Sequence, residues 1–195
     1  MKWTWDTDRI VSVSAMVVGV GSLAIILYQT KLMRESQHAS VMPYLAIVLQ
    51  SNNESTNLGV RNTGIGPALL QDVRVRYKGK DFVGDPYEFF VQQRPELFKT
   101  IGLGTDKLTP GRLVPAGEWI QNLGATRDAA TLAKAILELF VIAEVPKTWL
   151  VAAGVSAPES ERAVVFVTYK SVYGDQWYLR SDNFVPVSGP APRVP

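Results

Sequence analysis

The chain has 195 residues, a formal net charge of +2 and no cysteine. This length suits one domain with its own core, and a charge so close to zero gives no reason to expect a nucleic-acid binder. The absence of cysteine excludes disulfides, thiol nucleophiles, iron–sulfur clusters and thiolate zinc sites.

An apolar run lies near the N-terminus. Residues 10–28 contain no charged residue and no proline, and the nearest charged residues are Arg9 and Lys31. At about 1.5 Å per residue, a helix over this run is roughly 28 Å long and matches a hydrocarbon core of about 30 Å. The run therefore predicts one transmembrane helix, preceded by a flank at residues 1–9. A cleaved signal peptide fits less well, because the run is longer than a signal peptide's apolar region and no cleavage site follows it.

Aromatic residues stand at both ends of this predicted span. Trp3 and Trp5 precede it and Tyr28 closes it, as is typical of anchors at the two membrane interfaces. Basic residues are divided evenly between the two flanks, so the positive-inside rule does not decide the orientation. Acidic residues gather on the N-terminal flank, which favours a cytoplasmic large domain, with a periplasmic domain as the alternative.

Small residues recur on one face of the predicted span, at Ser12, Ala15, Gly19 and Ser22. In lipid, such a face lets the backbone of a second helix approach closely. The face predicts a docking element for a partner helix. The alternative is that small residues are simply frequent in membrane helices.

The polar segment 29–42 continues the helix as a short stalk, and Pro43 ends it. Beyond it, alternating apolar and polar residues predict strands. These strands cover residues 44–49, 57–62, 69–77, 112–123, 163–171 and 176–181, and the strand at 112–123 has a bend at 115–118 near its start. The last two form a hairpin around Gly174. Short strands separated by turns predict an antiparallel β-sandwich over residues 43–184.

Two helical insertions interrupt this mainly β pattern. Residues 86–101 are aromatic and predicted to be helical in pieces broken at Pro95, whereas residues 128–143 carry one apolar face. Large apolar residues in and after these insertions are candidate contacts to a partner or to the bilayer, with packing on the domain as the alternative. They are Phe89, Phe90, Phe98, Trp149 and Leu150.

The tail, residues 185–195, contains four prolines and no strand pattern. We expect it to be extended, and either disordered or laid against a partner.

No residue pattern points to catalysis, a metal or a cofactor. His38, the only histidine, lies in the stalk, so a triad or a histidine-bound metal would rest on one residue. No dinucleotide or phosphate-loop motif is complete. We therefore expect no enzyme, no cofactor and no small-molecule substrate.

Three segments carry a resemblance: VMPYL at 41–45, LGVRNTGIGPA at 58–68 and YKSVYG at 169–174. With the N-terminal helix, they resemble a broad group of uncharacterised bacterial single-span membrane proteins with an immunoglobulin-like β-sandwich. The resemblance implies this fold and a single pass through the bacterial inner membrane. It implies no reaction and no ligand.

These features favour a non-catalytic accessory subunit that stabilises a larger membrane complex of respiratory, photosynthetic or transport type, with integral membrane subunits as its partners. The alternative is a self-standing anchored sensor or ligand-binding module, with a pocket between the sandwich and the helix at 128–143.

Overall fold

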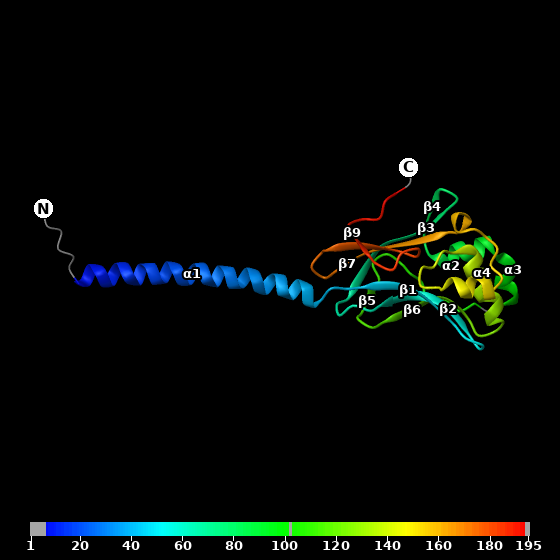
Figure 1. Ribbon diagram of the computed structural model, residues 1–195, viewed down its shortest axis with the longest axis horizontal. Coiled ribbons are helices and arrows are strands. Elements are labelled where there is room, and N and C mark those ends of the chain that lie inside the picture. Colours follow the sequence, from blue (N-terminus) through cyan, green and yellow to red (C-terminus); the bar gives the residue numbers. More distant parts are fainter. Residues whose placement is uncertain (1–6, 102, 194–195) are drawn as a thin grey trace. The chain divides into compact units, whose positions relative to one another are not determined.

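The computed structural model describes residues 7–101 and 103–193 (Figure 1). The chain divides into two compact units, Met1–Ser40 and Val41–Pro195. The first unit contains helix α1 (Thr7–Ser40). Over Thr7–Gln37 this helix is long and apolar enough to cross a membrane. The Ser12 and Ser14 hydroxyls donate to carbonyls four residues earlier, both at 2.8 Å. Such internal bonds satisfy polar groups that hydrocarbon cannot.

The second unit contains two antiparallel sheets (Figure 1). The smaller sheet has the order β1-β2-β6, and the larger sheet has the order β4-β3-β7-β8-β9, with β5 paired to β3. The smaller sheet is built from β1 (Leu45–Ser51), β2 (Thr56–Asn62) and β6 (Trp119–Ala125). The larger one is built from β3 (Ala68–Tyr77), β4 (Lys80–Val83), β5 (Leu113–Val114), β7 (Val164–Lys170), β8 (Gln176–Arg180) and β9 (Val187–Ser188).

One hydrophobic core serves both sheets. On β3 the core-facing half of the predicted alternation is confirmed, since Val73 and Val75 are buried in this core. Tyr169 of β7 is fully buried, and its hydroxyl oxygen accepts a hydrogen bond from the Leu45 backbone N–H at 3.5 Å. This bond links the larger sheet to the smaller one. Burial also raises the pKa of Tyr169 well above its ordinary value.

Helices cover one end of this core (Figure 1). They are α2 (Pro86–Gln93), α3 (Pro95–Thr100), α4 (Ala129–Leu139) and α5 (Lys147–Ala152), followed by a 3₁₀ turn at Glu159–Glu161. Asp85 caps α2 by accepting from the Tyr87 N–H, and Pro95 begins α3 because a proline fits the first helical position. The break at Pro95 thus separates two short helices.

The loop at residues 62–68 packs directly on the segment that follows α1. Asn62 is fully buried, and its amide nitrogen donates to the carbonyls of Gly66 at 2.8 Å and Val114 at 3.0 Å. Its oxygen accepts from the backbone N–H groups of Tyr44 at 3.2 Å and Gly64 at 3.1 Å. A side chain therefore takes the place of missing backbone pairs in this loop.

Two sequence-based expectations are corrected here. The strand predicted at 112–123 is two strands in different sheets, because Pro115 and the left-handed Gly117 turn the chain from β5 to β6. The tail was expected to have no strand, but β9 pairs with the open edge of β8. Arg74 and Arg76 then donate to the Ala191 and Pro192 carbonyls at 3.4 and 2.7 Å. Arginine side chains can hold this segment through its carbonyls, whereas its prolines have no backbone N–H to donate to a neighbouring strand.

Candidate functional site

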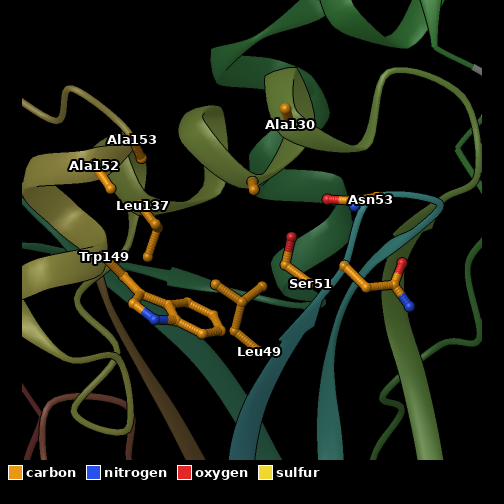
Figure 2. A pocket seen from close by; sticks show the side chains of 10 residues that line it. Leu49, Ser51, Asn53, Ala130, Leu137, Trp149, Ala152 and Ala153 are labelled. Atoms are coloured by element: carbon orange, nitrogen blue, oxygen red, sulfur yellow. The ribbon is translucent and has the colours of Figure 1, made fainter.

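An open groove of about 470 Å³ lies between α4, α5 and the turn that joins β1 to β2. Figure 2 shows its side chains pointing into a common space from these three segments. No lining residue is charged. The lining consists of Leu49, Ser51, Asn52, Asn53, Ala130, Ala133, Leu137, Trp149, Ala152 and Ala153.

Helix α4 supplies one wall through a second stripe of residues. Its main apolar face, with Leu132 and Ile136, is fully buried in the core. Ala130, Ala133 and Leu137 recur at helical spacing beside that face and line the groove. Two of the three are alanines, so this wall is low and a polypeptide backbone can approach it closely.

Helix α5 supplies the opposite wall and the only large aromatic side chain of the lining. Trp149 is 46% exposed, and Figure 2 shows its ring beside Leu49. Leu150, the next residue, packs against the core instead. The structure therefore separates two residues that the sequence grouped as candidate contacts: Trp149 faces the groove and Leu150 faces the core.

The turn between β1 and β2 is held in shape by its own side chains. The Asn52 side-chain oxygen accepts from the backbone N–H groups of Glu54 at 2.9 Å and Ser55 at 2.7 Å. The Thr56 hydroxyl donates to the Ala129 carbonyl at 2.8 Å and is also bonded to Ser51. These bonds tie the turn to the start of α4, so the two sides of the groove are pre-organised.

Outside the groove, the buried Asp85 carboxylate and Arg74 guanidinium both have structural partners. The Asp85 carboxylate accepts from the backbone N–H groups of Tyr87 and Leu108, both at 2.8 Å, and from the Asn122 amide. Arg74 contacts Asp72 at 2.7 Å. Within residues 7–101 and 103–193, no group of three or more acidic or histidine side chains can hold a metal ion.

The ion pair between Arg112 and Asp106 lies on the surface. The Arg112 Nη1 and Asp106 Oδ1 atoms are 2.6 Å apart, and the hydrogen bond from Arg112 lowers the pKa of Asp106 below its ordinary value. Asp106 therefore stays ionised at neutral pH and holds the arginine in place.

The expectation that Phe89 and Phe90 contact a partner is corrected, because both are buried in the core. The ring of Phe89 packs against Tyr77 and Phe140 at centroid distances of 5.6 and 6.0 Å. Phe98, on α3, stays 48% exposed and remains a candidate contact.

On α1, Ser12, Ala15, Gly19, Ser22 and Tyr28 are all exposed along the helix. Apart from the backbone of α1 itself, no atom of the described residues lies within 4 Å of a methyl group built at Gly19, so this position is open to a neighbour. The predicted anchors Trp3 and Trp5 lie outside the described residues.

No family model, no curated protein and no solved structure matches this chain.

Proposed function

We propose that this protein is a non-catalytic accessory subunit of a larger bacterial membrane complex. In this proposal, α1 crosses the inner membrane once and the second unit is an immunoglobulin-like β-sandwich on the cytoplasmic side. The groove between α4, α5 and the β1–β2 turn receives a polypeptide segment of a partner subunit. The observation that carries the proposal is this open, uncharged groove with its half-exposed tryptophan.

The chemistry of the groove suits a polypeptide. Trp149 offers a large rigid apolar surface at its rim, and tryptophan is among the residues that dominate binding energy at protein interfaces. The low alanine wall on α4 leaves room for a backbone beside it. Asn53 and Ser51 place polar groups at the other rim (Figure 2), where they can orient the bound segment.

The sandwich assignment is supported by the two antiparallel sheets and their shared core. The chain also changes sheet between β5 and β6, as connections in sandwiches do.

The proposal is tested by purifying the tagged full chain from its own membranes in mild detergent and quantifying the accompanying proteins by mass spectrometry. We expect a constant set of integral membrane subunits. Ala130→Arg fills the groove with a charged side chain and should reduce the recovery of at least one subunit about tenfold. Thr131→Arg is the matched control, because Thr131 is exposed on the same helix and does not line the groove.

The proposal fails if the protein purifies alone or only with copies of itself. The groove assignment fails if Ala130→Arg and Thr131→Arg retain the same subunits. Circular dichroism of both variants checks that they remain folded.

The volume of the groove also supports a second function, that of a self-standing ligand-binding module, because about 470 Å³ lies within the range of small-molecule pockets. In that case the protein purifies without partner subunits. Native mass spectrometry of the purified chain then shows a bound small molecule, which Ala130→Arg displaces.

A further inference from the structure

Large exposed apolar side chains gather at one end of the second unit, where the chain arrives from α1. We call them the junction surface. Its members are between 40% and 68% exposed and are Met42, Ile65, Leu113, Val172 and Tyr173.

Backbone pairing brings these residues together from separate segments. Next to Ile65, the Gly66 N–H donates to the Met42 carbonyl at 3.4 Å. On β3, Leu69 pairs with Leu113 on one side and with Lys170 on the other. The turn that carries Val172 and Tyr173 begins just after Lys170, so all these segments lie at the first end of β3 (Figure 1).

The length of α1 limits how far this end lies from the bilayer. The apolar run ends at Tyr28 and α1 ends at Ser40. A helix over residues 29–40 is about 18 Å long. At the usual tilts of about 0–40°, it rises roughly 14–18 Å above the hydrocarbon core. Since the headgroup layer takes up only about 5–7 Å of this height, the last residue of α1 stands clear of the lipid.

At this height, the neighbours of an accessory subunit are the loops and helix ends of integral membrane proteins. A cluster of large exposed apolar side chains marks an interaction site. Arg112, the residue before Leu113, already forms ion pairs with Asp106 at 2.6 Å and with Glu118 at 3.3 Å. Anionic lipid is held by clusters of free basic residues. Arg112 is not free, and the half-buried Lys170 is a single base and not a cluster, so the charges do not favour a lipid partner.

We propose that the junction surface binds an apolar extramembrane surface of the integral membrane subunit that packs beside α1. This inference rests on the proposed function and adds a second contact, separate from the groove. It assigns the partner as a membrane subunit that protrudes from the bilayer on the side of the large domain.

The test uses the absence of native cysteine. Ile65→Cys, Leu113→Cys and Val172→Cys each place a single thiol on the junction surface. Val83→Cys is the matched control, because Val83 is 83% exposed and pairs with Arg74, away from the first end of β3. A water-soluble maleimide is applied to the full chain in open fragments of native membrane. It is also applied to the purified full chain, one copy per nanodisc, in phosphatidylcholine and phosphatidylglycerol.

We expect the three junction thiols to react at least about fivefold more slowly in native membranes than in nanodiscs, and the control thiol to react equally in both. If the junction thiols react as fast as the control thiol in both settings, the inference is overturned, because nothing then covers the surface. If they react more slowly than the control thiol in the nanodiscs, it is overturned in favour of lipid.

Purification of the same variants separates the two proposals. If the subunits accompany the protein but the thiols react freely, only the junction surface is wrong. If no subunit accompanies the protein, the proposed function fails and the inference fails with it.

Discussion

The buried side chain of Asn62 offers the sharpest test of how the domain is held together. Its four hydrogen bonds join the loop at 62–68 to Tyr44 and to Val114. Asn62→Ala removes all four and leaves two N–H groups and two carbonyls without their partner. Solvent does not replace the bonds to the Gly66 and Val114 carbonyls, because both of these residues are buried.

The expected loss of stability follows from the number of bonds. A neutral hydrogen bond contributes about 1 kcal/mol net, and a buried group left unpaired costs about 1–3 kcal/mol. Because Asn62→Ala removes four such bonds at about 1 kcal/mol each, we expect it to lower the free energy of unfolding by about 4 kcal/mol. Domains of this kind are stable by about 5–15 kcal/mol, so the variant should fold with little margin.

The measurement is urea unfolding of the full chain in detergent micelles, followed by near-ultraviolet circular dichroism. Asn53→Ala is the matched control, because Asn53 is exposed in the β1–β2 turn, and its change should stay within about 0.5 kcal/mol. A loss below about 1 kcal/mol for Asn62→Ala would refute the reasoning, because the four bonds would then not support the loop.

Three further perturbations test other parts of the structure. Truncation after Asn183 removes the carbonyls that Arg74 and Arg76 contact, so the domain should stay folded with its free energy of unfolding lowered by about 1–3 kcal/mol in urea. An unchanged urea midpoint would show that the tail is not part of the fold. Burial raises the folded pKa of Tyr169 above its unfolded value near 10, so its stabilising contribution is complete below about pH 10 and is lost as pH rises further. Tyr169→Phe should flatten that alkaline loss in pH-dependent unfolding, and identical slopes would contradict the assignment. Gly19→Leu should weaken co-purification of membrane subunits and leave membrane insertion intact, and undiminished recovery would remove the small-residue face from the proposal.

The strands could be predicted where burial follows a local alternation, and not where distant segments decide it. On β3 the pattern correctly predicts that Val73 and Val75 face the core. The same pattern assigns Arg74 to the opposite face, yet Arg74 is only 4% exposed. Asp72, Asp81 and the carbonyl of Ala191 surround its guanidinium. That burial depends on the tail, whose prolines gave no sign of a strand.

The groove shows the same limit for the candidate site. The apolar face of α4 was visible in the sequence, because Leu132 and Ile136 follow the helical period. The groove is lined by the neighbouring alanine stripe, by Trp149 and by the turn at residues 51–53. These three segments are far apart in the chain, and only packing brings them together. The sequence therefore left open whether Trp149 packs on the domain or faces a partner.

The contacts of the segment at residues 58–68 explain why it contains two glycines and an asparagine. A methyl group at Gly66 would collide with the Val41 carbonyl, and one at Gly64 would collide with the Tyr44 backbone. The two glycines therefore let the loop lie against residues 41–44, and Asn62 bonds it there. Since residue 41 directly follows α1, the chain joins the domain core within a few residues of the helix.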